Sequence, residues 1–167
     1  MNPEVTKTCG IALIPSIITL GLVQACGGSS DAVAQAAPAA ADPYEGVWEA
    51  VATRRDCTTG VVTGTFRGAH VIHRGGTLSD TNAAPTATRG PGWGIWSRNA
   101  DGTYAVKFRF YTYNADGSWS GTAVVTSKRT LNADATTYNG DTTSEVLDTS
   151  GNVIARTCVT DVGTKFK

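Results

Sequence analysis

The feature of this sequence that most constrains its fold is a repeated succession of alternating strand patterns and tight-turn patterns. Two copies of Asn-Ala-Asp-Gly flank the segment TYAVKFRFYTY at residues 103–113. Within it, Val106, Phe108 and Phe110 alternate with more polar side chains. A period of two residues indicates a strand with one buried face, and Asp-Gly between two such strands is typical of an antiparallel hairpin. The centre of the chain therefore predicts consecutive β-hairpins.

Similar strand patterns continue on both sides of this region, and no convincing helical period follows residue 43. The composition agrees, because 19 glycines and only 17% charged residues suit strands and turns better than helices. About eight strands joined mostly by short turns predict an all-β fold, a small antiparallel up-and-down β-barrel. The other segments expected to hold strands are 44–57, 60–76, 92–98, 118–131, 136–148 and 153–166.

The four cysteines divide into two near the N-terminus and two within the expected barrel. The latter, Cys57 and Cys158, form an even pair, which predicts one disulfide in an oxidising compartment. Two reduced, buried thiols are the alternative. Because a disulfide needs Cα atoms within about 7 Å of each other, this bond would make the first and last strands neighbours and close the barrel.

A register follows if Cys57 and Cys158 face each other across an antiparallel strand pair. Trp48 then lies opposite Lys167 and diagonal to Lys165, give or take a bulge. A lysine ammonium over the indole ring would form a cation–π contact.

The sequence Gly46-Val47-Trp48 at the start of the first strand, with a basic residue beside it on the last, resembles the calycin signature. Calycins are up-and-down barrels that include lipocalins and fatty-acid-binding proteins. The resemblance implies an internal ligand cavity and a part for Gly46, Trp48, Lys165 and Lys167 in barrel closure. In calycins the basic residue is an arginine, and lipocalins carry a helix after the barrel. This sequence has lysines and no evident helix.

A longer set of landmarks is similar to a group of uncharacterised secreted bacterial proteins. The landmarks are RDC, GTF, HRGGTLSDT, RGPGWGIW, NADGSWSGT and TCVTD, and they span nearly all of residues 44–166. No activity is known for that group, so this resemblance implies no catalytic residues.

The N-terminus resembles the signal peptide of a bacterial lipoprotein. An apolar run at residues 10–23 is too short for an ordinary membrane-spanning helix and is typical of a secretory signal. Val23, Ala25 and Cys26 resemble a lipobox, which implies that residues 1–25 are removed and that Cys26 carries the lipid. A plain secretory signal cleaved further along the chain is the alternative.

The expected organisation has three parts. These are a lipoprotein signal peptide at 1–25, the lipidated Cys26 with a flexible linker at 26–42, and the β-barrel domain at 43–167. Gly27, rather than an aspartate, follows Cys26, and this favours the outer membrane facing the periplasm, or the cell surface. Three acyl chains would anchor the protein firmly, whereas a single chain binds only marginally.

The two histidines of the chain, His70 and His73, are three residues apart. On a strand this spacing sends them to opposite faces, so a metal shared by both is not expected. No motif of a hydrolase or a zinc protease is present, and no cofactor or metal is predicted. The residues expected to line a ligand cavity are His70, His73, Trp93, Trp96, Phe108 and Phe110.

Arginines concentrate in the first half of the chain. If several converged at one barrel mouth, they would receive an anionic ligand such as a carboxylate or phosphate; the alternative is a solvated surface balanced by nearby aspartates. These arginines are residues 54, 55, 67, 74, 89 and 98.

Basic and acidic residues number 14 each, and the resulting net charge of zero argues against nucleic acid as a partner. The expected function is that of a non-catalytic envelope lipoprotein whose barrel binds a small or apolar ligand. One alternative is a structural or interaction module with its interior filled by Trp48, Phe108, Phe110 and Trp119. Another is a small barrel enzyme of the cyclase or isomerase kind. The sequence leaves the oligomeric state open.

Overall fold

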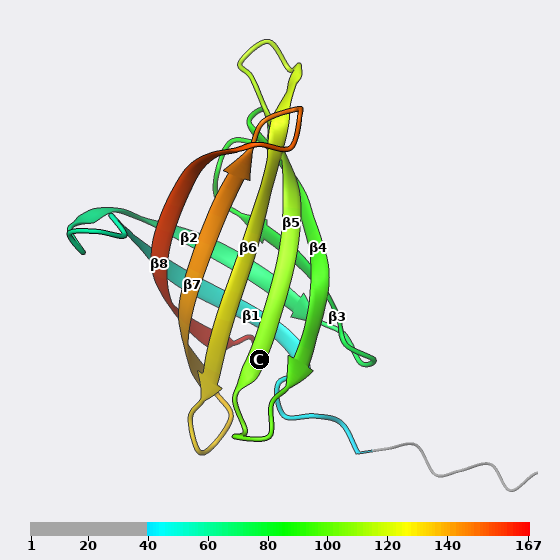
Figure 1. Ribbon diagram of the computed structural model, residues 1–167. Coiled ribbons are helices and arrows are strands. Elements are labelled where there is room, and N and C mark those ends of the chain that lie inside the picture. Colours follow the sequence, from blue (N-terminus) through cyan, green and yellow to red (C-terminus); the bar gives the residue numbers. More distant parts are fainter. Residues whose placement is uncertain (1–39) are drawn as a thin grey trace, which may run out of the picture. The chain divides into compact units, whose positions relative to one another are not determined.

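The computed structural model describes residues 40–167, which contain eight antiparallel strands and no helix (Figure 1). Each strand pairs with its neighbours in the chain, and β8 pairs with β1, so the sheet closes into a barrel. The predicted all-β, up-and-down barrel is confirmed. The predicted signal peptide and Cys26 lie outside the described residues. The strands are β1 (Gly46–Arg55), β2 (Val62–Ile72), β3 (Thr77–Asn82), β4 (Arg89–Arg98), β5 (Tyr104–Tyr113), β6 (Trp119–Leu131), β7 (Thr137–Leu147) and β8 (Val153–Lys165).

Three hairpin turns repeat the same chemistry, at Asp101, Asp116 and Asp134. In each turn the carboxylate accepts hydrogen bonds from the backbone N–H and the hydroxyl of the Ser or Thr two residues later. These bonds favour the charged form and lower the pKa of all three carboxyls, that of Asp101 to about 2. A glycine at positive φ follows the first two aspartates, whereas Ala135 takes that place in the third turn with a φ of 54°.

The predicted disulfide between Cys57 and Cys158 is confirmed, with a Cα–Cα distance of 5.1 Å. It encloses a sequence separation of 101 residues, for which loop-closure entropy gives a stabilisation of about 4 to 5 kcal/mol. The register differs from the prediction, because Cys57 lies in the loop after β1 and Cys158 pairs with Arg55. The bond therefore runs diagonally, and every partner on β8 is shifted by two residues.

This shift brings Lys165, and not Lys167, opposite Trp48. The ammonium nitrogen of Lys165 lies 5.3 Å from the indole centroid and donates a hydrogen bond of 2.8 Å to the carbonyl oxygen of Pro43. Lys167 lies beyond the end of β8 and is exposed. Gly46 is close to the same lysine, because a Cβ atom there would stand 3.0 Å from its Cε.

One end of the barrel is closed by four buried aromatic residues that we call the aromatic plug: Tyr44, Trp48, Tyr104 and Tyr138. The Tyr44 ring lies 4.5 Å from that of Tyr104 and 5.8 Å from that of Trp48, centroid to centroid. The chain enters the barrel here, since the hydroxyl of Tyr104 donates a 2.7 Å hydrogen bond to Asp42. The packed rings occupy this end of the barrel, and none of them lines the cavity described below.

Candidate functional site

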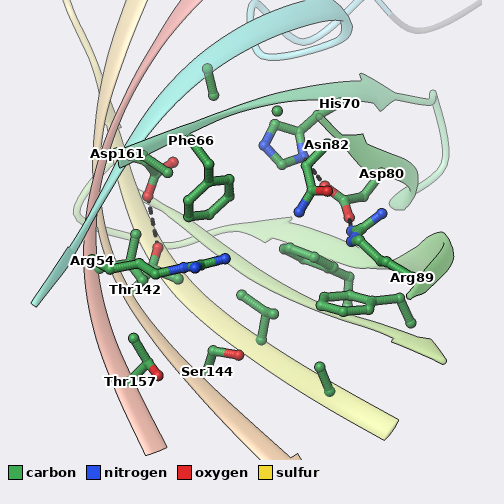
Figure 2. A pocket seen from close by; sticks show the side chains of 18 of the residues that line it. Arg54, Phe66, His70, Asp80, Asn82, Arg89, Thr142, Ser144, Thr157 and Asp161 are labelled. Atoms are coloured by element: carbon green, nitrogen blue, oxygen red, sulfur yellow. Dashed lines mark hydrogen bonds and ion pairs between the residues drawn. The ribbon is translucent and has the colours of Figure 1, made fainter. Parts of the chain in front are cut away.

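The half of the barrel away from the aromatic plug contains a cavity of about 320 Å³. Residues from all eight strands line it, and Figure 2 shows that their side chains converge on a common space. It lies towards the loops that join β1 to β2, β5 to β6 and β7 to β8, because its lining comes from those ends of the strands. Three layers of side chains can be distinguished: a polar floor next to the plug, largely apolar walls, and a polar mouth.

One side of the polar floor is built by β2, β3 and β4. His70 and Asp80 face each other on β2 and β3, and the imidazole Nδ1 lies 3.2 Å from a carboxylate oxygen of Asp80. The other oxygen of Asp80 accepts a hydrogen bond from the guanidinium of Arg89 on β4. All three side chains are buried. A buried carboxylate needs such partners, because an unpaired charge away from water is costly.

The other side of the floor is built around Arg129 on β6, which is only 2% exposed. Its guanidinium lies 3.4 Å from a carboxylate oxygen of Asp161 on β8 and 3.3 Å from Nε2 of His70. It also donates a 2.7 Å hydrogen bond to the hydroxyl of Tyr44 in the plug. A second oxygen of Asp161 accepts a 2.8 Å hydrogen bond from Thr142 on β7. The polar floor is thus one continuous network that spans the barrel.

His70 connects the two halves of this network in its neutral form. Burial lowers its pKa, and the positive charge of Arg129 lowers it further, against the opposing effect of Asp80. A guanidinium only donates and a carboxylate only accepts. The neutral imidazole therefore accepts at Nε2 from Arg129. Its Nδ1 faces the carboxylate of Asp80 at 3.2 Å without forming a hydrogen bond.

Two glycines make room for the two aspartates of the floor. Gly92 on β4 pairs with Asp80, and a Cβ atom there would lie 2.6 Å from the carboxylate. Gly140 on β7 pairs with Asp161, where the same distance would be 2.5 Å. These distances are shorter than any ordinary contact, so each carboxylate occupies the space that a neighbouring side chain would otherwise fill. The glycine-rich segment RGPGWGIW supplies one of these positions, Gly92.

The walls above the floor are formed mostly by apolar side chains. Phe108 and Phe110 point inward from β5, and Phe66 points inward from β2. Arg89 stacks on Phe110 with its guanidinium carbon 3.9 Å from the ring centroid. The remaining apolar lining residues are small or branched: Ala50, Ala52, Ala123, Val125, Val146 and Val159. Small side chains at these positions leave the space open.

The mouth carries Arg54 and a set of hydroxyl groups. Arg54, near the end of β1, is exposed, and its guanidinium carbon lies 4.6 Å from the centroid of Phe66. Figure 2 shows its guanidinium pointing into the cavity, with Ser144 and Thr157 on the same side of the space. The mouth is therefore cationic and rich in hydrogen-bonding groups.

Of the six residues expected to line a cavity, His70, Phe108 and Phe110 do so. His73 follows the end of β2, is exposed, and lies with Nε2 3.0 Å from the hydroxyl of Ser79. Trp93 is on the outer surface and 42% exposed. Trp96 points inward from the same strand but packs at the closed end, with its ring centroid 5.6 Å from that of Tyr44.

Two of the residues expected to fill the barrel interior, Trp48 and Trp119, do not line the cavity. Trp48 belongs to the aromatic plug, whereas Trp119 is 48% exposed and packs outside the barrel against Tyr111. Of the six arginines singled out in the sequence, Arg54 and Arg89 face the cavity.

The sequence reasoning missed Arg129, Asp80 and Asp161. The sequence did contain a signal for them, because each lies an even number of residues from inward-facing apolar residues on its own strand. Arg129, for example, continues the inward series of Ala123 and Val125. A charged residue in phase with a buried face is a marker of an interior polar site.

Residues 40–167 contain no group of three or more side chains suited to hold a metal ion. The same part of the chain has no helix of the length and apolarity needed to cross a membrane. Comparison with family models and with curated proteins gives no match for this chain.

Proposed function

We propose that this protein is a non-catalytic, ligand-binding lipoprotein of the bacterial cell envelope, whose barrel receives a small, largely apolar ligand. The observation that carries the proposal is the cavity of about 320 Å³ with aromatic and aliphatic walls. Its size is at the lower end of the range of about 300 to 1,000 Å³ that is typical of small-molecule sites. A few polar groups among apolar walls are also typical of such sites.

The polar floor supports binding rather than catalysis. A general base needs a free atom directed at the substrate, but Nε2 of His70 accepts from Arg129 and Nδ1 faces the carboxylate of Asp80. The carboxylates of Asp80 and Asp161 are likewise paired with arginines. The floor therefore forms a fixed bottom of the cavity in which the charges are balanced.

The place where the chain enters the barrel is compatible with attachment through its N-terminal part. Asp42 and Pro43 are bound at the closed end through Tyr104 and Lys165, and the cavity mouth is at the other end.

Fluorescence titration with N-phenylnaphthylamine, a neutral apolar probe, tests the cavity. The full-length chain carrying Cys26→Ser, which removes the predicted lipid, is expected to bind the probe saturably. Ala52→Phe directs a large ring into the cavity from β1 and should weaken this binding about tenfold or more, equivalent to about 1.4 kcal/mol. Ala105→Phe, at an exposed position on β5, is the matched control and should leave the affinity unchanged. Absence of saturable binding, or equal binding by Ala52→Phe, would refute the proposal.

Membrane fractionation tests the anchor separately. In a bacterial host, the unsubstituted chain is expected in the membrane fraction and the Cys26→Ser chain in the soluble fraction, because the lipid is the only proposed attachment. Equal partitioning of the two chains would contradict lipidation at Cys26 and leave the cavity result unaffected.

A further inference from the structure

We propose that the cavity selects ligands that carry one negative charge, and that Arg54 holds the acidic group of the ligand at the mouth. This inference rests on the proposed ligand-binding function and specifies the chemical class of the ligand: a small apolar molecule bearing a carboxylate, sulfonate or similar monoanionic group.

The charges that line the cavity do not balance. Three arginines and two aspartates contribute to the lining. The remaining titratable group is His70, which is neutral near pH 7 because burial lowers its pKa. One positive charge is left over. A cavity with uncompensated positive charge attracts an anion, and its low-dielectric walls strengthen that attraction.

The uncompensated charge belongs to Arg54. Arg89 is paired with Asp80, and Arg129 is paired with Asp161. Across residues 40–167, no carboxylate lies within ion-pair distance of the Arg54 guanidinium. Within these residues the guanidinium stacks on the face of Phe66, which orients it without neutralising it.

Asp56 is the acidic residue nearest to Arg54 in the sequence, but it is hydrogen-bonded within its own loop. Its carboxylate accepts hydrogen bonds from the backbone N–H groups of Thr58 and Thr59 and from the hydroxyl of Thr59. These bonds shape the loop between β1 and β2 and lower the pKa of Asp56. Asp56 is thus bonded within its own loop and makes no ion pair with Arg54, which stays available to a ligand.

The surroundings of Arg54 suit an amphipathic anion. A guanidinium binds a carboxylate or sulfonate through two parallel hydrogen bonds. Ser144 and Thr157 provide hydroxyls on the same side of the cavity (Figure 2), and Phe66, Phe108 and Phe110 provide apolar surface deeper inside. An acidic group at the mouth and an apolar body between the phenylalanines would match this order of side chains.

Two probes that differ by one acidic group test the inference: anilinonaphthalene sulfonate and the uncharged N-phenylnaphthylamine. Affinities are measured on the full-length Cys26→Ser chain. Adding Arg54→Gln is expected to weaken sulfonate binding about tenfold or more and to change binding of the neutral probe less than about twofold. Arg54→Lys, which keeps the charge but loses the planar fork, should have an intermediate effect. Arg67→Gln, which replaces an exposed arginine of β2, is the matched control and should alter neither affinity.

The outcomes separate the two proposals. An equal loss for both probes in Arg54→Gln would overturn anion selection while retaining the binding cavity, because it would mean that Arg54 contributes only packing. Unchanged sulfonate affinity in Arg54→Gln would overturn it as well. Failure of the starting chain to bind either probe would refute the proposed function together with this inference. Circular dichroism of each variant checks that the barrel is folded.

Discussion

The two ends of this barrel are built on the same strands but have opposite interiors. Along β1 the inward side chains are Trp48 at the closed end, then Ala50 and Ala52, and finally Arg54 at the mouth. The backbone alternation is the same throughout. The two ends differ only in the size and polarity of the inward residues: a large one fills the closed end, and small or polar ones leave the cavity open. A single strand thus supplies both the packing that stabilises the fold and the wall of the cavity.

The polar floor separates these two regions and is connected to both. Arg129 donates to Tyr44 of the aromatic plug below it, and it lines the cavity above. Replacing either partner of a buried ion pair leaves the other charge unpaired, at a cost of about 3 to 5 kcal/mol. The floor thus couples the stability of the closed end to the shape of the cavity.

The largest expected difference between the two ends is in their response to changes of side-chain size. Trp48→Ala removes a side chain with no exposed surface and should lower the free energy of unfolding by about 3 to 5 kcal/mol. Ala52→Phe places its ring in the open space of the cavity and should lower the free energy of unfolding by at most about 1 to 3 kcal/mol, the cost of overpacking a filled core. Urea denaturation measures both. Trp119→Ala, at a 48% exposed tryptophan outside the barrel, is the control and should cost less than about 1 kcal/mol. Equal effects of Trp48→Ala and Trp119→Ala would remove the distinction between plug and surface.

A smaller effect is expected from the protonation of His70 in the floor. Burial and the charge of Arg129 lower its folded pKa, against the opposing effect of Asp80 and Asp161, whereas the unfolded chain has a value of about 6.5. The unfolded state therefore binds the proton more readily, and stability should fall as the pH drops below about 6.5, with a slope of up to about 1.4 kcal/mol per pH unit. The loss should stop once the folded pKa is passed.

Denaturation curves recorded from about one pH unit above the unfolded value of about 6.5 to about 1.5 pH units below it measure this dependence. His70→Gln should flatten it, and His73→Gln, which changes the exposed histidine, should preserve it. A pH dependence that survives His70→Gln would show that the floor does not titrate through this residue.

Much of the fold could be predicted from local patterns. The period-two alternation of residues 103–113 and the Asn-Ala-Asp turns are properties of short segments, and they determine strand and hairpin independently of the rest of the chain. The disulfide could be predicted because Cys57 and Cys158 are the only two cysteines in the barrel region. Its register could not, because Cys57 lies past the end of β1 and no local signal marks where that strand ends.

The candidate site could be predicted only in part. Phe108 and Phe110 were expected to line the cavity, because both lie on the apolar face of a clear strand pattern. His70 and His73 were expected on opposite faces, but which of them turns inward depends on the pairing of β1 with β2 and on the point where β2 ends. The ion pairs of the floor could not be predicted from the sequence. Arg129 and Asp161 are on strands separated by β7, so no strand pairing brings them together.

The strands, the turns, the cysteine pairing and the alternation of inward and outward residues can all be predicted from the sequence, because they follow from local backbone geometry or from simple counting. The network of Arg89, Asp80, His70, Arg129 and Asp161 exists only in the folded barrel, and so does the separation of Arg54 from every carboxylate of residues 40–167. The tilt and stagger of the closed barrel determine which inward side chains lie at the same height across it. The height of a side chain along the barrel axis depends on the whole sheet and cannot be derived from one strand alone.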